Sequence, residues 1–539
     1  MTLEICFAKD KLNARKIWML RASNLQLQSD TEIVAVDPTE NFIRYYHFLE
    51  KEFSRFLIED SLCSVPSMMD GLKTTQRKVL FAAMEGLKGK KRVDEFAGDV
   101  VNKTVYKHGS SHMEGTIIGM AQTFVGSNNV NLLHPTGQFG SRYEGGKDHS
   151  TAYYLYVELN DITKFIFRDD DKDLLEFLEE DGKLVQPKWY LPVVPMSLVN
   201  GTTGIGSGGG SNIPNHHMND VINALFKLLR GPAIAEDRNS ISLKPGYRGF
   251  KGRVEKSTDN ERGIKCTIYG CATEISDTVV EINEIPPGKT IVEYRSFLQS
   301  LMPDACNRSE SSKMKYPTIE CFQELHEDEN NLRFKISLDK SNMMFARKRG
   351  LLEAFNLVRK MSVETLYLLD EIQELRQFDN AEETLTTFFD MRLPYYAARK
   401  AKLLERMSND MIRIDNTILY LEAMDKGEIK QMNRKKLVAK FTEKGYKAIP
   451  NDGDSGFDHL INLSCDERDI ECLPNLVAER EGLHQRMEEM QKARDIDLWI
   501  KDLEELQQKL AEEGVEPQKR KVERTSASSA SDKRTRFGP

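Results

Sequence analysis

The stretch GGKDHSTAYYLYVEL, residues 145–159, places two adjacent tyrosines, Tyr153 and Tyr154, after a glycine-rich polar segment. A phenol has a pKa of about 10, so it becomes a good nucleophile only when its proton is removed or its oxyanion is stabilised. The same stretch has a simpler interpretation, because aromatic residues that alternate with Leu155 and Val157 are typical of a half-buried strand. The local sequence favours the strand, so the surroundings of the pair must decide between the two.

A locally basic segment precedes the tyrosines and could contact phosphates. Between Gly71 and Met120 the sequence has nine Lys or Arg residues against five Asp or Glu residues, although the net charge of the whole chain is −8. Phosphate binding depends on the local surface potential rather than on the total charge. The total charge therefore does not exclude a nucleic acid as the ligand.

Two helices are expected to position this basic segment. Residues 76–84 have the apolar spacing of a helix that would carry Arg77 and Lys78 on its polar side. A second helix is expected to begin at Gly109 and Ser110. Basic residues and histidines at the start of a helix are typical of a helix-turn-helix that binds phosphates. The residues of this kind around the second helix are Lys103, Lys107, His108 and His112.

The composition indicates an ordinary globular protein of several domains. With 539 residues, of which 40% are hydrophobic and 30% charged, the chain is too long for one core, and roughly three or four domains are expected. It has no run of about 18 apolar residues, so no membrane span is expected. The eight cysteines are scattered without a C-x-x-C pair, which argues against a zinc site or a disulfide framework and favours a reducing compartment.

The hydrophobic pattern changes twice along the chain. Residues 41–215 mix short helices with glycine-rich loops, and short alternating runs over about 216–341 predict an α/β or mostly β insert. Two later segments follow a heptad spacing, which predicts an antiparallel coiled-coil arm with a small globular tip, although two ordinary amphipathic helices explain the spacing equally well. The heptad residues are Leu404, Met407, Met411, Ile414, Ile418 and Leu421, then Leu476, Leu483, Met487 and Met490.

Two charged stretches are expected to lie in solvent. The acidic run RDDDKD, residues 168–173, follows the tyrosines and lacks the strand-and-loop context of a metal site, so we interpret it as a solvated acidic turn. The tail from about Val515 is basic and serine-rich, so it is expected to be disordered. Lys519, Arg520 and Lys521 in this tail could act as a nuclear import signal or could simply be solvated.

Three long blocks resemble one known family. SVPSMMDGLKTTQRKVLF, AQTFVGSNNVNLLHPTGQFGSRYEGGKD and WYLPVVPMSLVNGTTGIGSG closely resemble the breakage-reunion core of eukaryotic type IIA DNA topoisomerases. YRGFKG resembles the tower domain of that family, FFDMRLPYYAARKAKLLERM the start of its coiled-coil arm, and DLWIKDLEELQQKL the helix that returns from its C-terminal gate. The resemblance covers nearly all of residues 5–512, in the order of the family.

The resemblance implies an α+β, multi-domain fold with a winged-helix DNA-binding core, an α/β tower insert, and a long antiparallel coiled-coil arm with a small helical C-gate. It also implies a nuclear location. The expected ranges are 1–40 for a linker that follows a TOPRIM domain, 41–215 for the winged-helix breakage-reunion domain, 216–345 for the tower, 346–513 for the arm and dimer gate, and 514–539 for a disordered basic tail.

The resemblance also assigns roles to the two tyrosines. The family's nucleophile follows GGKD in a pattern like G-G-K-D-x-x-x-x-R-Y, and this spacing places it at Tyr154. Its phenolate would attack a backbone phosphorus, and one tyrosine from each protomer of a two-fold dimer would cut both strands. The arginine of the pattern, which holds the scissile phosphate, is replaced here by Tyr153. Loss of that guanidinium is expected to cost on the order of 10²-fold or more in rate.

Three nearby side chains could compensate for the missing arginine, namely Lys147, Arg142 and His149. The adjacent pair also permits Tyr153 as a second, less favoured nucleophile.

Other positions match residues with which the family contacts DNA. Ile205, in TTGIGSG, matches an isoleucine that wedges between base pairs, and Gln138, in GQFG, lies in a loop that supports the catalytic pocket. Such a wedge unstacks one step and lets stiff DNA bend, at a cost of roughly 1–6 kcal/mol that extra backbone contacts recover. His112 stands where the family more usually has serine. The other expected contacts are Lys73, Arg77, Lys78, Lys103, Tyr106 and His108.

The family's ATPase and its Mg²⁺-binding TOPRIM domain have no counterpart in these motifs. Mg²⁺ and ATP sites are therefore expected on a partner chain, and no metal site is expected in this one. The expected partners are double-stranded DNA, a second protomer in a homodimer or heterodimer through the C-gate, and a topoisomerase chain or paralogue that bears the TOPRIM and ATPase domains. No membrane partner is expected.

Two functions of different classes remain open. The first is that of a type II topoisomerase-like enzyme that bends, cleaves and religates duplex DNA through a 5′-phosphotyrosyl intermediate and thereby aids chromosome segregation, with activity that could be incomplete or impaired. The second is that of a non-catalytic, dimerising chromosomal paralogue that binds and bends DNA without cleaving it. Tyr154 favours the enzyme, whereas Tyr153 and the unmatched domains favour the second function.

Overall fold

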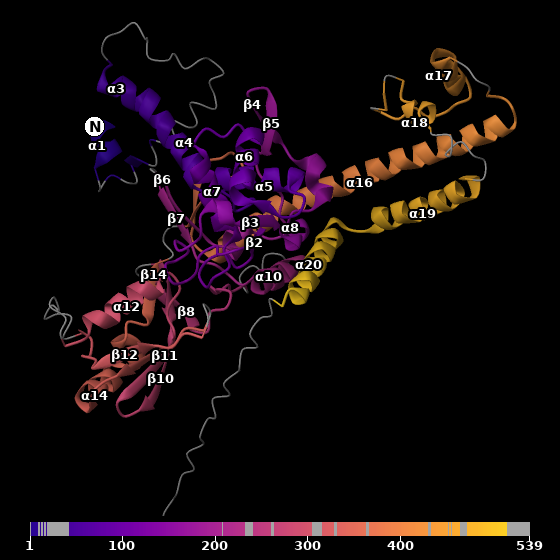
Figure 1. Cartoon of the computed structure of the whole chain (residues 1–539). Helices are drawn as coiled ribbons and strands as arrows, with labels where there is room; N and C mark the ends of the chain where they lie inside the picture. Colours follow the sequence, from indigo (N-terminus) through magenta and orange to yellow (C-terminus); the bar gives the residue numbers. More distant parts are fainter. Residues whose placement is uncertain are drawn as a thin grey trace, which may run out of the picture.

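The computed structural model combines helices and sheets in a body from which a long helical arm projects (Figure 1). It describes residues 2–8, 11, 14, 15, 18, 43–206, 209–231, 241–259, 263–303, 315–327, 331–362, 366–429, 433–450, 452, 453, 455–463 and 472–514. The tail with Lys519, Arg520 and Lys521 and most of the first 40 residues lie outside the described residues. Of the described helices, none is both long enough and apolar enough to cross a membrane.

Three helices and a three-stranded antiparallel sheet form the centre of the first core. They are α5 (Thr74–Gly86), α6 (Val93–Lys103), α7 (Ser110–Ala121), β1 (Lys91–Arg92), β2 (Leu133–Thr136) and β3 (Tyr156–Leu159). The strands are ordered β1-β3-β2, and Arg92 is paired with Tyr156. Val79, Val100 and Ile117 bury apolar side chains between the helices. Their burial explains why the expected helices form, since apolar residues at helical spacing are excluded from water on one face.

Several shorter elements extend or border this core. They are η3 (Ala152–Tyr154), α8 (Asp161–Ile166), η4 (Asp169–Leu174), β4 (Phe177–Glu180), β5 (Lys183–Pro187), α9 (Met196–Val199), β6 (Thr202–Gly206), β7 (Gly209–Ile213), α10 (Met218–Arg230), β15 (Leu366–Leu369) and β16 (Leu375–Phe378). Strands β4 and β5, β6 and β7, and β15 and β16 form antiparallel two-stranded pairs. Helix α10 lies beyond residue 215 but buries Val221 and Leu225 in the first core. The expected domain ranges stay predictions.

The N-terminal described segment forms a small separate cluster. Its elements are α1 (Thr2–Phe7), α3 (Tyr45–His47), η2 (Phe48–Phe53), which is a π-helix, and α4 (Ser54–Ser64). Cys6, Trp18, Leu49 and Leu57 are buried together there. The Trp18 indole N–H donates a hydrogen bond to Glu50 at 3.0 Å, which ties residue 18 to the helical segment.

Gly71 fixes the approach to α5. Its φ is +68°, and a Cβ atom at this position would lie 2.2 Å from the main-chain nitrogen of Ser197. Only glycine adopts this conformation without steric cost and leaves room for the neighbouring chain. Sequence positions 71 and 197 are thereby held in direct contact at the base of the β6–β7 hairpin.

A second core forms a separate lobe at the lower left of Figure 1. It contains α12 (Ile291–Ser300), β10 (Cys271–Ser276), β11 (Val279–Glu284), β12 (Cys321–Glu324), β13 (Phe334–Ser337), α14 (Lys340–Arg349) and α15 (Leu351–Ala354). The sheet order is β10-β11-β13-β12, and all its pairs are antiparallel. A three-stranded sheet links this lobe to the first core, because Cys266 and Ile268 of its central strand are buried in the first core. Its strands are β8 (Arg253–Asp259), β9 (Gly263–Tyr269) and β14 (Val358–Ser362).

The arm consists of one helix that leaves the body and another that returns beside it (Figure 1). The elements are α16 (Ala381–Asp425), α17 (Arg434–Glu443), α18 (Asp458–Ile461), α19 (Leu473–Lys492) and α20 (Asp495–Glu512). Helices α16 and α19 contact each other, and the ten heptad residues are buried or half-buried. At the far end, Tyr420, Phe441, Tyr446, Phe457 and Leu460 form a small apolar core. The classification as a coiled coil with a C-gate stays a prediction.

The expectation of a solvated acidic turn at residues 168–173 holds for the exposed Asp169, Lys172 and Asp173 but is wrong for Asp171. The side chain of Asp171 is 2% exposed and accepts hydrogen bonds from Arg392 Nη2 at 2.6 Å and Arg399 Nε at 2.8 Å. Arg399 also pairs with Asp502 of α20 at 2.6 Å. A buried carboxylate requires such partners because desolvation is costly. The turn therefore joins the base of α16 to the body, and the distant arginines that do this cannot be recognised from the acidic run itself.

Candidate functional site

The two tyrosines lie outside the strand and are exposed. They form the end of the 3-10 turn η3, and β3 begins only at Tyr156. Tyr153 is 56% exposed and Tyr154 69% exposed, whereas Leu155 and Val157 are fully buried. The two phenol rings meet edge to face, with centroids 5.2 Å apart. The half-buried strand therefore accounts for Leu155 and Val157 but not for the tyrosines.

The turn is fixed by main-chain hydrogen bonds. The N–H of Tyr154 donates to the carbonyl of Thr151 at 2.9 Å, and the N–H of Val93 donates to the carbonyl of Leu155 at 2.9 Å. Gly137 lies directly against the turn, since a Cβ atom there would be 3.2 Å from the carbonyl oxygen of Tyr154. These contacts hold the main chain of the turn while both tyrosine side chains remain exposed.

A guanidinium group that the sequence did not single out lies against the pair. The Cζ atom of Arg92 is 4.4 Å from the ring centroid of Tyr153. Arg92 also pairs with Asp94 at 3.1 Å and with Glu95 at 2.9 Å. The pKa of Arg92 is raised, because partial desolvation, which lowers it, is outweighed by the two carboxylates. Only the pairing of Arg92 with Tyr156 across β1 and β3 could have revealed this neighbour.

The loop before the turn is anchored to the second core. Arg142 is buried, contacts Glu284 at 2.6 Å in an ion pair that lacks hydrogen-bond alignment, and donates to the carbonyl of Ile285. The N–H groups of Ile291 and Val292, at the start of α12, donate to the carbonyls of Arg142 and Tyr143 at 3.3 and 3.2 Å. Arg142 therefore faces the protein interior rather than the tyrosines. It cannot supply the missing guanidinium in this conformation.

The other residues of this loop are more accessible. Gln138 is exposed, and its side-chain oxygen accepts a hydrogen bond from the N–H of Gly140 at 3.2 Å. Its main-chain carbonyl accepts from the N–H of Ser150 at 2.9 Å, which closes the loop. Lys147 and His149 are also exposed, and His149 contacts the carbonyl of Ser150 at 2.8 Å.

The expectation that Arg77 and Lys78 lie on a polar helix face is wrong. Both are 5% exposed. Arg77 donates to both carboxylate oxygens of Asp70, at 2.6 and 3.0 Å. Lys78 donates to the carbonyl of Thr104 at 2.7 Å and to Glu180 at 3.2 Å. Their charges are thus used inside the fold, where they connect α5 to its neighbours, and the surface that the sequence assigned to them is not exposed.

An aromatic and imidazole cluster lies at the start of α7. The Tyr106 hydroxyl and His112 Nδ1 form a hydrogen bond, and the ring of Tyr106 meets that of His108 edge to face at 5.4 Å. His108 and His112 are exposed. Partial burial raises the pKa of Tyr106. Lys103 contacts the ring of Phe81 at 5.1 Å, at the end of the preceding helix α6. The expected DNA contacts of this group therefore come together at one helix N-terminus, which favours anions.

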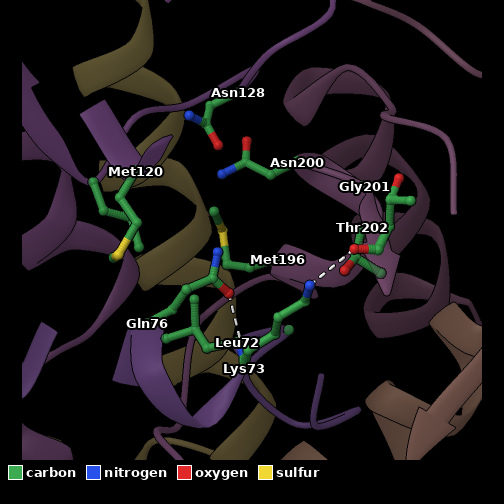
Figure 2. A pocket seen from close by; sticks show the side chains of 12 residues that line it. Leu72, Lys73, Gln76, Met120, Asn128, Met196, Asn200, Gly201 and Thr202 are labelled. Carbon is green, nitrogen blue, oxygen red and sulfur yellow. Dashed lines mark hydrogen bonds between the residues drawn. The ribbon is translucent and has the colours of Figure 1, made fainter. Parts of the chain in front are cut away.

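Lys73 lies at a pocket of about 140 Å³ near the base of the β6–β7 hairpin (Figure 2). Its ammonium group donates to the carbonyl of Thr203 at 2.9 Å, and its main-chain N–H donates to Gln76 at 2.9 Å. Partial burial lowers the pKa of Lys73. On the hairpin above, the main chain of Ile205 pairs with Gly210. The side chain of Ile205 lies outside the described residues, so its wedging role stays a prediction.

The described residues do not form a recognisable metal site. Within the described ranges, no three His, Cys, Asp or Glu side chains lie close enough together to hold one. Asp171, the most buried member of the acidic run, is engaged by two arginines. We therefore assign no step of the chemistry to a metal bound by these residues, and the expected Mg²⁺ and ATP sites on a partner chain stay predictions.

Comparison with solved structures identifies the class of protein. The fold matches the "Plasmodium falciparum topoisomerase II DNA-binding, cleavage and re-ligation domain" with a TM-score of 0.81 and 28% identity, over 95% of this chain and 70% of that one. Because the match covers 95% of this chain, it includes most of both cores and of the arm. The class is thus that of type II DNA topoisomerase cleavage cores.

Sequence comparisons identify the family. A family model for the A-type subunits of DNA gyrase and topoisomerase IV matches residues 63–504, and the chain belongs to this family. DNA topoisomerase 2 of Arabidopsis thaliana is 32% identical over 545 residues, which cover 94% of this chain and 35% of that protein. DNA topoisomerase 2-alpha of Homo sapiens is 31% identical over 455 residues, which cover 83% and 29%. The resemblance expected from the sequence motifs is confirmed, and the chain spans about a third of the length of these relatives.

Proposed function

We propose that this chain binds duplex DNA and cleaves and religates it through Tyr154, thereby changing DNA topology. The observation that carries the proposal is the exposure of Tyr154 on a turn held by main-chain hydrogen bonds, in a chain that belongs to a topoisomerase family. A nucleophile for a DNA backbone must be accessible, and a fixed main chain reduces the entropy lost on reaching the phosphate. The turn provides both properties.

The proposed cleavage is a transesterification at phosphorus. The Tyr154 hydroxyl loses its proton to water, and the phenolate oxygen forms a bond to the phosphorus. The bond from phosphorus to the 3′-oxygen of the neighbouring nucleotide breaks, and this oxygen takes a proton from water. The resulting 5′-phosphotyrosyl linkage is itself a phosphodiester and retains the energy of the broken bond, so the 3′-hydroxyl can attack the phosphorus, release the tyrosine and reseal the strand.

The proposed DNA surface combines the start of α7 with nearby basic side chains. The exposed His108 and His112, together with Lys107, lie at the positive end of the α7 dipole. Lys103 and Lys73 belong to neighbouring segments of the same core. Phosphate contacts of this kind supply salt-dependent affinity rather than sequence specificity. In this proposal the β6–β7 hairpin with Ile205 bends the bound duplex.

The proposal includes partners, because one nucleophilic tyrosine per chain cuts one strand and cleavage of a duplex requires two. Two copies, or one copy and a paralogue, pair through the end of the arm so that two tyrosines face two strands. A TOPRIM- and ATPase-bearing chain supplies Mg²⁺ and ATP. The setting is the nucleus, where the activity aids chromosome segregation.

A second function is favoured by one specific observation. Tyr153 occupies the position at which the resemblance expects an arginine, and the buried Arg142 does not replace it. A chain without an effective cation at the scissile phosphate would bind and bend DNA without cutting it. This second candidate is a dimerising, DNA-binding chromosomal protein.

Trapping with a protein denaturant distinguishes the two functions. The full chain is mixed with end-labelled duplex DNA, Mg²⁺ and a type II topoisomerase partner whose own nucleophilic tyrosine has been replaced by Phe. A labelled adduct with the mass of this chain, absent in Tyr154→Phe, supports the enzyme. DNA binding without any adduct supports the second function.

A further inference from the structure

Arg92 is the only guanidinium group among the described residues that contacts the ring of Tyr153 or Tyr154. The resemblance expects an arginine at position 153, next to the nucleophile, and the sequence has tyrosine there. Arg92 approaches the same place from β1, which is 61 positions earlier in the chain. A cationic side chain from a different element can supply the same positive charge to a site, even though the arginine of the sequence motif is replaced.

The backbone of Arg92 is fixed relative to the tyrosine turn. Arg92 is paired with Tyr156 across the sheet, and the N–H of the next residue, Val93, donates to the carbonyl of Leu155 at 2.9 Å. The register of β1 against β3 and this hydrogen bond therefore fix the main chain at Arg92 relative to the turn that carries Tyr153. The ring also offers a favourable cation–π surface for the guanidinium.

The side chain of Arg92 retains the capacity to contact a phosphate. Its Nε and Nη2 atoms donate to Asp94, and Nη2 also contacts Glu95, whereas Nη1 has no hydrogen-bond partner among the described residues. The side chains of Arg92, Asp94 and Glu95 are all partly in water, at the edge of the body. Exposed ion pairs contribute little net stability, so a phosphate oxygen could replace one of these carboxylates at small cost.

We infer that Arg92 contacts the scissile phosphate in place of the arginine expected at position 153, with the ring of Tyr153 as its support. This inference rests on the proposed cleavage function and assigns a cation to it. No covalent bond to Arg92 forms or breaks. Its guanidinium donates hydrogen bonds to non-bridging oxygens while the phenolate of Tyr154 attacks the phosphorus.

The test compares Arg92→Ala with a matched control, Arg347→Ala. Like Arg92, Arg347 is partly exposed and is held by two carboxylates, Glu274 and Asp277, but it belongs to α14 in the second core. Adduct formation is measured by denaturant trapping in the presence of the partner described above. We expect Arg92→Ala to slow it on the order of a hundredfold and Arg347→Ala to leave it unchanged. Tyr153→Arg in the Arg92→Ala background should restore adduct formation, because it returns a guanidinium to the site.

A binding measurement keeps this inference separate from the proposed cleavage. The affinity of the full chain for duplex DNA is measured against salt concentration, which requires no cleavage. Loss of one phosphate contact should reduce the magnitude of the log–log slope by about 0.9 in Arg92→Ala. Equal slopes and equal adduct yields in the two alanine variants would overturn the role of Arg92. Absence of any adduct from the unmodified chain would contradict the cleavage function, and a reduced slope would still support the phosphate contact.

Discussion

The main-chain N–H of Val93 donates a hydrogen bond of 2.9 Å to the carbonyl of Leu155, and this bond joins the first turn of α6 to the residue that follows the two tyrosines. The turn that carries Tyr153 and Tyr154 is therefore held by the helical core and not only by the loop that precedes it. Substitutions in the core that keep this contact should leave the tyrosines in place, whereas those that remove supporting groups should affect stability first.

Removal of the charge of Asp171 should destabilise the protein. In Asp171→Asn the buried Arg392 and Arg399 lose their shared countercharge, and we expect the free energy of unfolding to fall by about 3–5 kcal/mol. The control is Asp169→Asn, in the same turn, where the carboxylate is exposed and pairs only with Lys172, with an expected change of at most ~1 kcal/mol. Urea unfolding measures both. Similar losses in the two variants would contradict the anchoring role of Asp171.

The ion pair between the two cores provides a second prediction. Glu284→Gln leaves the Arg142 guanidinium buried without a countercharge, so a loss of about 3–5 kcal/mol in the free energy of unfolding is expected. The surface substitution Glu274→Gln, which affects an exposed pair with Arg347, serves as the control. If urea unfolding shows no difference between the two variants, the buried pair does not stabilise the junction of the cores.

Alanine substitutions at two glycines with positive φ distinguish the cost of backbone strain from the cost of a steric clash. Gly89→Ala should cost about 1–2 kcal/mol, because its φ is +74° but no atom lies within 4 Å of an added Cβ. Gly71→Ala has a similar φ and also places the Cβ against the main chain of Ser197, so a further loss of about 1–3 kcal/mol is expected. Equal shifts in the urea midpoint would show that the chain relaxes around position 71.

The buried His216 should make the stability depend on pH. Desolvation lowers its pKa to about 4, while its ring Nδ1 contacts the carbonyl of Leu198 at 3.1 Å. At a pH between about 4 and the unfolded-state pKa of about 6.5, the unfolded state binds more protons at His216 than the folded state does. The free energy of unfolding therefore falls as the pH falls from about 6.5 to about 4, and the full contribution of His216 is present above pH 6.5. The contribution amounts to about 3 kcal/mol. His216→Gln should flatten the difference between urea unfolding at pH 7 and at pH 4.5, and an unchanged difference would contradict the assignment.

The sequence predicted the features that depend on local pattern. The heptad residues, such as Ile414 and Leu483, are buried or half-buried where α16 and α19 contact each other, because apolar periodicity is a local property of a helix. The assignment of the nucleophile to Tyr154 came from the family resemblance and stays a prediction, although the structure does expose this side chain. The comparisons confirm the family resemblance itself, whereas the order and ranges of the large units that it implies stay predictions.

The features that the sequence did not predict depend on long-range contacts. Arg77 and Lys78 were expected in solvent because a charged side chain on a helix usually lies there, but Asp70 and Thr104 provide partners inside the fold. Arg92 lies beside Tyr153 only because of the register of β1 against β3. Asp171 is paired with residues more than 200 positions away. Asp70 lies only seven positions before Arg77, but Thr104 lies 26 positions after Lys78, and the partners of Arg92 and Asp171 are more distant still.

Peptide mapping of the trapped adduct tests the central assignment most directly. After nuclease digestion, trypsin should release the peptide DHSTAYYLYVELNDITK, residues 148–164. This peptide contains Tyr153, Tyr154 and Tyr156. Fragment-ion masses then locate the nucleotide on one of the three phenols. We expect a 5′-phosphate ester on Tyr154. A nucleotide found on Tyr153 or Tyr156, or on no residue of this peptide, would contradict the assignment of Tyr154 as the nucleophile.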